Sequence, residues 1–395
     1  HLPIHRMVHR RLLLRVLRKN QMQRKTAGRH QREVRLIQRG AEIPGNSRAE
    51  KHMKSIKEDA QLQTEEMKYL AELIMAQMDG RMPLPVPMDI EVKQLIRYAM
   101  DAHMEYLILS SLIKLPVSAE EKQEIQRRLM CSTMRTLAQV NAVREIEQRF
   151  ELEGIKFQVL KGAILKHVYP SPEMREMSDI DIMVYDRTLD HAQQVLNEMG
   201  YVEVEAIKHH VIYSKAPFLI LEAHWALYDK NLDVNQDIYF NDHFRAKSIP
   251  GKKYSYQFST EDFYVYMVAH MAKHFYENGC GIRNLLDIYI YLQKYSESMN
   301  MQSVEAELTK CGLNCFEMHI RKLAFIWLQQ QESTDFYNHL FQYMLDCGIY
   351  GKGENGIWGQ LAKRDITGKN IRIHYYFPEK KYMKEQYVWL QKYPW

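Results

Sequence analysis

Two aspartates separated by one residue, Asp179 and Asp181, give the strongest chemical signal in this sequence. They lie in an alternating polar and apolar run over 179–184, the pattern of a β-strand in which residues i and i+2 share a face. Two adjacent carboxylates repel each other unless a cation lies between them, and Mg²⁺ prefers carboxylate oxygens and bridges to substrate phosphates. The pair therefore indicates half of a metal site for phosphoryl chemistry. A solvated strand edge is the alternative interpretation.

A third carboxylate, Glu222, interrupts an otherwise apolar strand predicted over 218–225. A buried glutamate needs a partner, and a metal ion shared with the aspartate pair would supply one. A salt bridge to a lysine or arginine is the alternative. His224 follows on the same strand face, where it either orients a ligand or caps the core, and we favour the core.

A strand-to-helix turn is predicted about seventeen residues before the aspartate pair, at Lys161, Gly162 and Ala163. Glycine at such a turn lets the backbone approach a phosphate, and the start of the following helix attracts anions. Lys161 and Arg175 are candidate cations for a triphosphate. The Lys-Gly pair alone is weak evidence, because a glycine at a helix entrance is usually only a turn.

Two histidines spaced by four, His270 and His274, share one face of a predicted helix. Cys280 is near enough in sequence to suggest zinc, but the glutamate of an H-E-x-x-H motif is absent. We therefore interpret the histidines as core residues or as contacts to a nucleotide. Arg283 and Asp287 stand at helical spacing, so they either pair with each other or leave Arg283 to reach a phosphate.

These residues require a sheet to position them, and the apolar periodicity predicts a small mixed sheet between two helical regions, an α+β architecture. We expect an N-terminal helical region over 53–154, an α/β domain over 155–250, and a C-terminal helical domain with an aromatic-rich tail over 251–395. The predicted helices span 55–80, 90–113, 119–129, 131–153, 163–168, 188–199, 260–274, 282–295, 303–310, 314–330 and 333–347, and the predicted strands span 155–159, 179–184, 201–205, 210–214 and 218–225.

Basic character is concentrated in residues 1–52, which contain 14 Lys or Arg and 3 Asp or Glu in a chain of net charge +5. The remainder is therefore mildly acidic. Such an arm could contact RNA, DNA or anionic lipid. Its weak apolar pattern, and the cleaner start at Met53, favour a disordered tail or non-native sequence.

Composition indicates a globular protein with a large core. A chain of 395 residues at 46% hydrophobic can fill two or three domains. The five cysteines are odd in number and scattered, which predicts free, mostly buried thiols and a cytoplasmic location. We expect no signal peptide and no membrane span, because no apolar run approaches about 18 residues.

In order along the chain, the glycine turn, the aspartate pair and the later glutamate resemble the nucleotidyltransferase superfamily related to DNA polymerase beta. The closer resemblance is to a bacterial group called uncharacterised nucleotidyltransferases, over roughly residues 60–395. Its motifs correspond here to Val159–Gly162, Arg175, Ser178–Ile182, Glu222–Trp225, His270 and His274, Arg283–Asp287, Phe377-Pro378, Tyr382-Met383 and Tyr393–Trp395.

The resemblance implies a nucleotidyltransferase-like domain over 155–250 that moves a nucleoside monophosphate from an NTP to a hydroxyl-type acceptor and releases pyrophosphate. It implies two Mg²⁺ or Mn²⁺ ions held by the catalytic carboxylates Asp179, Asp181 and Glu222. The residues expected to bind the nucleotide are Lys161, Gly162, Ala163, Arg175 and Arg283. The residues expected to surround the metal ligands are His224, His270 and His274. The acceptor remains open among a small molecule, a sugar, tRNA and a protein, and the oligomeric state is open too.

One departure from the superfamily pattern lies at the turn, where Gly-Gly or Gly-Ser is usual and this chain has Gly162-Ala163. The missing hydroxyl removes one phosphate contact. Because a fold does not establish an activity, two alternatives are kept. One is a catalytically silent member that binds a nucleotide or a partner, and the other is a nucleic-acid-binding protein that uses the basic arm.

Overall fold

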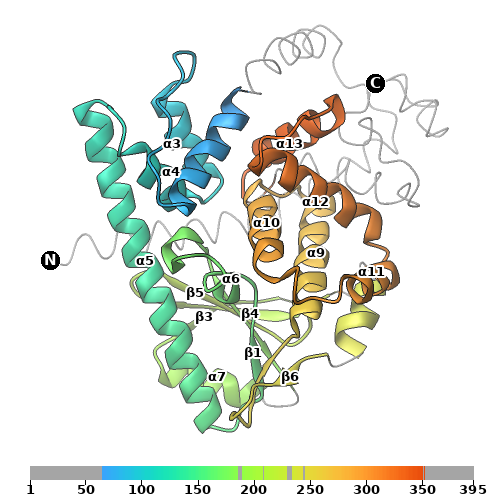
Figure 1. Ribbon diagram of the computed structural model, residues 1–395. Coiled ribbons are helices and arrows are strands. Elements are labelled where there is room, and N and C mark those ends of the chain that lie inside the picture. The colour runs from blue at the N-terminus through green and yellow to red at the C-terminus, as the bar shows by residue number, and fades with distance from the viewer. Residues whose placement is uncertain are drawn as a thin grey trace, which may run out of the picture.

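A seven-stranded mixed sheet forms the centre of the molecule, with strands in the order β3-β4-β5-β2-β1-β7-β6 (Figure 1). The computed structural model describes residues 65–185, 189–207, 209–228, 234–242, 245–349 and 351. The strands are β1 (Phe157–Val159), β2 (Ile180–Val184), β3 (Val202–Ile207), β4 (His210–Lys215), β5 (Leu219–His224), β6 (Lys247–Ser248) and β7 (Ser255–Gln257). The predicted α+β class with a mixed sheet is confirmed.

The central strand β2 pairs with β1 in antiparallel and with β5 in parallel orientation. Asp181 stands opposite Glu222 and Met183 opposite His224 in the β2–β5 register. Because side chains alternate between faces along a strand, these four residues share one face of the sheet.

The opposite face of β2 carries Ile180, Ile182 and Val184, whose exposed fractions are 0%, 0% and 2%. They pack in one hydrophobic cluster with residues of helices α5 (Ala119–Leu152) and α7 (Leu189–Glu198). The prediction that the apolar residues Ile180, Ile182 and Val184 of this strand point into a core is confirmed, and Asp181 and Met183 between them lie on the other face.

Helices of the C-terminal region cover that other face (Figure 1). Met183 and Tyr266 belong to the larger hydrophobic cluster, which extends through these helices. The helices are α9 (Thr260–Glu277), α10 (Arg283–Tyr295), α11 (Met301–Lys310), α12 (Asn314–Leu328) and α13 (Asp335–Cys347). All five agree with the predicted helices to within a few residues, since long amphipathic segments are set by their apolar period.

The N-terminal helices differ from the prediction in two places. A helix expected over 90–113 is divided into α3 (Val92–Asp101) and α4 (Glu105–Leu112), with the break at His103, whose φ is 51°. Two helices expected over 119–153 form the single 34-residue helix α5, which begins at a capping box between Ser118 and Glu121. No proline or glycine interrupts that segment, so the helix continues.

Helix α6, predicted over 163–168, spans Lys161–Leu165. Several short elements were not predicted: η1 (Pro172–Met174), α8 (Val234–Asp237), the π-helical η2 (Ile238–Asp242), β6 and β7. Strand β7 pairs with β1, so the sheet continues past residue 250. The helix expected from residue 55 is described from 65 to 78, and Gly80, with a φ of 67°, follows it.

Two predictions from composition concern the cysteines and the absence of a membrane span. All five cysteines are free thiols, three of them buried. None of the helices in the described ranges is long and apolar enough to cross a membrane. The basic arm over 1–52 and the tail motifs from Phe377 to Trp395 lie outside the described residues.

Candidate metal and nucleotide site

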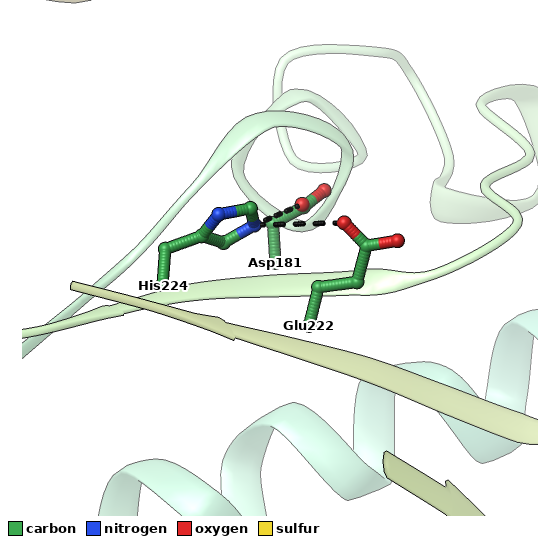
Figure 2. A group of neighbouring side chains, drawn as sticks. All are labelled: Asp181, Glu222 and His224. Carbon is green, nitrogen blue, oxygen red and sulfur yellow. Dashed lines mark hydrogen bonds and ion pairs between the residues drawn. The ribbon is translucent and has the colours of Figure 1, made fainter. Parts of the chain in front are cut away.

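The face that carries Asp181 brings together a group of three side chains that could hold a metal ion, Asp181, Glu222 and His224 (Figure 2). One ligand atom from each lies within 4.8 Å of the other two. The Nε2 of His224 is 3.0 Å from Oδ1 of Asp181 and 3.7 Å from Oε2 of Glu222. The grouping follows from the parallel register of β2 and β5, which sets Asp181 beside Glu222 and places His224 two residues further along.

Burial of this group means that its carboxylate charge must be compensated within the protein. Asp181 is 4% exposed, and His224 is 7% exposed. A buried carboxylate that stays ionised requires cations or hydrogen-bond donors. Burial alone would raise the pKa of Asp181, but the Lys161 ammonium and the hydrogen bond from His224 together hold that pKa below its ordinary value. Asp181 is therefore an anion at neutral pH.

Lys161 supplies a positive charge at the centre of the group. Its Nζ lies 2.8 Å from Oδ1 of Asp181. Burial would lower the pKa of Lys161, but the carboxylates of Asp181, Glu222 and Asp179 hold it above its ordinary value. The φ of Lys161 is 45°, in the left-handed region that a non-glycine residue rarely adopts. The turn thus aims the ammonium at Asp181.

Asp179 occupies a different position from the one that the sequence predicts. It lies one residue before β2 begins and is not among the three side chains of the metal-capable group. It is half-buried, and its charge acts on Asp181, Lys161 and Arg175. The parallel register of β2 and β5 therefore brings Asp181 beside Glu222, and the role of Asp179 as a metal ligand stays a prediction.

Gly162 serves packing in this structure. A Cβ at this position would come within 3.0 Å of the Met177 Cβ and 3.6 Å of Nη1 of Arg175. The segment before β2 therefore approaches the turn so closely that a side chain at Gly162 would crowd Met177. Ala163 is buried at 6% exposed and belongs to the core beneath the sheet.

Arg175 is held in a buried ion pair with Asp287 on α10. Its Nε donates to Oδ1 at 2.6 Å and its Nη2 donates to Oδ2 at 2.8 Å. Tyr169 also donates to this carboxylate, at 2.7 Å. In this arrangement the guanidinium joins the segment before β2 to the C-terminal helices, and the phosphate contact expected of Arg175 stays a prediction.

Arg283 donates from Nη1 to the backbone oxygen of Glu176 at 3.1 Å. Pairing with Asp287 was one of the two alternatives for Arg283, and that carboxylate is bound by Arg175 instead. Burial, together with the nearby Arg175 guanidinium, lowers the pKa of Arg283 to about 10. Its Nε is buried and has no hydrogen-bond partner within the described ranges. Arg283 is therefore a half-buried cation whose Nε is buried without a partner in the described residues.

The residue after Arg175 connects the same segment to the N-terminal helices. Glu176 is 4% exposed and accepts hydrogen bonds from the backbone N–H groups of Glu105 and Tyr106, at the start of α4, and from the hydroxyl of Ser132 on α5. A carboxylate at a helix N-terminus is stabilised by the unpaired N–H groups there. Arg175 and Glu176, here called the 175–176 junction, thus bind helices from both flanking regions.

Helix α9 covers the site face. The Nε2 atoms of His270 and His274 lie 3.0 Å apart. Burial, with the positive charge of Lys161, keeps the pKa of His270 well below its ordinary value, so this ring is neutral and close to the site. The histidine pair and Cys280 are not part of any metal-capable group of three in the described residues.

Two residues near the group were not predicted. Burial lowers the pKa of His210 to about 4, and its Nε2 lies 3.8 Å from Oε2 of Glu222. Tyr266, 2% exposed on α9, has a hydroxyl without a hydrogen-bond partner in the described part of the chain. Burial raises its pKa, and the charges of Asp181 and Glu222 add to this shift. In the sequence, Tyr266, His270 and His274 are spaced by four, and this spacing could have placed Tyr266 on the same helix face as the two histidines.

The donor set fits a divalent metal ion. Two carboxylates and one imidazole are ligands that such ions take in proteins, and their mutual distances are those of atoms that surround one ion. The net charge of the two carboxylates also requires compensation beyond one lysine.

The chain was compared with known families, curated proteins and solved structures. Residues 88–329 match the family described as uncharacterised nucleotidyltransferase. No curated protein matches the chain. Among solved structures, ANT(2″)-Ia in complex with adenylyl-2″-tobramycin is similar at 11% identity and a TM-score of 0.32, over 44% of this chain and 97% of that chain. An antigenic nucleotidyltransferase-like protein from Paracoccidioides brasiliensis is similar at 16% identity and a TM-score of 0.29, over 43% and 87%.

The family match carries the identification, because it covers more than half of the chain. It includes the turn at Lys161, the carboxylates Asp181 and Glu222, and the ion pair at Asp287. The chain belongs to the uncharacterised nucleotidyltransferase family.

Proposed function

We propose that this chain is an enzyme that transfers a nucleoside monophosphate from an NTP to a hydroxyl-type acceptor and releases pyrophosphate. The observation that supports the proposal most strongly is the group of Asp181, Glu222 and His224 on paired strands of a nucleotidyltransferase family member. A buried anionic group of this kind has no evident role in folding, since apolar residues would fill the same space at less cost.

Asp181 and Glu222 would hold the divalent ion, with Asp179 at the edge of the group. When bound, Mg²⁺ or Mn²⁺ supplies charge neutralisation at the triphosphate and at the acceptor oxygen. In the reaction, a new bond forms between the acceptor oxygen and the α-phosphorus, and the bond from that phosphorus to the bridging oxygen breaks. Pyrophosphate leaves with the bond electrons, and a neighbouring carboxylate takes the acceptor proton.

Two cations of the chain are assigned to the phosphates. Lys161 stands at the strand-to-helix turn with a raised pKa, so it carries its charge at neutral pH. Arg283 is a half-buried cation whose buried Nε has no partner in the described residues, and a phosphate oxygen would satisfy it. The two would bind the triphosphate from the turn and from α10, respectively.

The decisive experiment incubates the full-length chain with each α-labelled NTP, Mg²⁺ or Mn²⁺, and a cell extract, and measures both labelled product and pyrophosphate. Transfer of label that Asp181→Asn abolishes would support the proposal. Nucleotide binding by calorimetry without pyrophosphate release would identify a silent member instead. Asp190→Asn, which alters a carboxylate in the first turn of α7, is the matched control.

A further inference from the structure

The His224 ring takes part in the metal-capable group as a full member. It is the last residue of β5, and the strand places it on the face of Glu222. Its Nε2 faces both carboxylates, at 3.0 Å from Oδ1 of Asp181 and 3.7 Å from Oε2 of Glu222 (Figure 2). Ligands bound at about 2.1 Å and at roughly 90–110° to one another lie about 3.0–3.4 Å apart. The imidazole nitrogen is therefore at ligand spacing from Asp181 and near it from Glu222.

The position of the ring is fixed by the sheet. His224 is paired with Met183 of β2 on one side and with His210 of β4 on the other, and the N–H of Trp225 continues the ladder to the oxygen of His209 at 3.1 Å. With only 7% of the residue exposed, the ring has little freedom to turn away. A ligand held by strands on both sides is preorganised for an ion.

Oδ1 of Asp181 has two nitrogen neighbours, the ammonium of Lys161 at 2.8 Å and Nε2 of His224 at 3.0 Å. The buried hydroxyl of Tyr266 on α9 has no hydrogen-bond partner in the described residues. A buried polar group that its protein neighbours leave unsatisfied is expected where a hydrated ion or ligand binds.

We propose that His224 is a direct metal ligand and that the site binds a divalent ion of the first transition row, with Mn²⁺ as the probe, in preference to Mg²⁺. This inference rests on the proposed function. Mg²⁺ takes nearly all its ligands from oxygen and releases its waters reluctantly, whereas transition ions accept imidazole nitrogen together with carboxylates. One imidazole among the three donors therefore changes which ion the site selects.

The test measures Mn²⁺ bound to the full-length chain by pulsed electron paramagnetic resonance. We expect a ¹⁴N coupling from one directly bound imidazole, which changes to a ¹⁵N signature when histidine is labelled. His224→Gln should abolish the coupling, whereas His191→Gln, at a ring with 44% of its side chain exposed on α7, should retain it. The labelled wild-type chain shows whether a histidine binds the ion, and His210→Gln, which should retain the coupling, assigns it to His224 even if His224→Gln fails to fold. Bound Mn²⁺ without nitrogen coupling would overturn the proposal.

Calorimetry gives a second readout. We expect the wild-type chain to bind Mn²⁺ at least about tenfold more tightly than Mg²⁺, a difference of about 1.4 kcal/mol, and His224→Gln to lose most of this preference. Equal affinities for the two ions in the wild type would overturn the inference while leaving the transfer reaction in place. Nitrogen coupling without NTP turnover would support His224 ligation and contradict the proposed function. A chain that binds neither ion would overturn both.

Discussion

Lys161 and Asp181 form an ion pair at the centre of the site, with 2.8 Å between Nζ and Oδ1, and the lysine backbone has a φ of 45°. A non-glycine residue in this region costs of order 1–3 kcal/mol, so the surrounding structure must hold it there. The lysine charge and a divalent ion would act on the same carboxylate. The ion pair is therefore expected to weaken the affinity of the site for metal. When a metal ion binds Asp181, we expect Lys161 to leave the pair and contact phosphate.

Replacement of this lysine should strengthen metal binding. In Lys161→Met, the carboxylates lose a resident cation, and we expect affinity for Mn²⁺ without nucleotide to rise by about tenfold. Affinity for NTP should fall, because a phosphate contact is lost. Calorimetry with Mn²⁺ and then with NTP measures both changes. Lys310→Met, at a surface lysine paired with Glu307, should change neither, and an unaltered Mn²⁺ affinity in Lys161→Met would remove the competition.

Asp181→Asn should abolish transfer while the protein stays folded. The amide has nearly the same size, but it is a weak metal ligand, and the loss of metal stabilisation is expected to reduce the rate by roughly 10³-fold or more. Glu222 and Asp179 remain near Lys161, so its charge keeps compensation. Pyrophosphate release and the thermal midpoint are measured on the same preparation. Activity close to wild type would exclude Asp181 from the reaction.

Glu222→Gln separates a metal ligand from a structural ion-pair partner. If Glu222 binds metal, the Mg²⁺ titration should shift to much higher concentration, and high Mn²⁺ should restore part of the activity. If Glu222 only pairs with His210 and His224, stability should fall instead while the metal dependence stays the same. The thermal midpoint and the Mg²⁺ titration of one variant decide the question.

The buried Lys166 predicts a dependence of stability on pH. Burial, with the adjacent Arg175 charge, lowers its pKa from 10.5 to about 7. Between these values the unfolded chain retains a proton that the folded chain has lost, so the contribution of Lys166 to stability rises with pH. Against Lys166→Met, the free energy of unfolding of wild type should gain about 1 kcal/mol per pH unit from pH 7 to 9. Urea denaturation at pH 7, 8 and 9 measures this gain, and parallel profiles of the two proteins would contradict it.

The ion pair between Arg175 and Asp287 should contribute to folding. Asp287→Asn leaves a buried guanidinium without its counter-ion and should lower the free energy of unfolding by about 3–5 kcal/mol. The double variant Arg175→Met with Asp287→Leu should recover much of this loss, because neither charge remains. Urea denaturation of both variants tests the pair. Equal losses in the single and double variants would show that the charges are not coupled.

Local pattern predicted much of the fold. Alternation over 179–184 predicted which side chains of β2 face the core, and Ile180 and Ile182 lie there with no exposed surface. The same rule placed Glu222 and His224 on one face of β5. These predictions succeeded because the pleat of a strand and the period of a helix are properties of a few consecutive residues.

Contacts between distant segments could not be predicted in this way. Helical spacing suggested that Arg283 pairs with Asp287, yet the partner is Arg175, which is 112 residues away. The favoured core interpretation of His224 missed its approach to Asp181, because that contact depends on which strand lies beside β5. Spacing within one element carries no information about its neighbour in the sheet.

The 175–176 junction has a consequence for recombination within the family. Arg175 and Glu176 are consecutive, but their buried charges are compensated by Asp287 on α10 and by the start of α4, which belong to opposite ends of the described chain. A chimera that grafts the sheet of one relative between the helices of another inherits these two charges without their matched partners. Exchange is therefore expected to succeed for whole catalytic units that retain all three segments, and the sheet is not a transferable part.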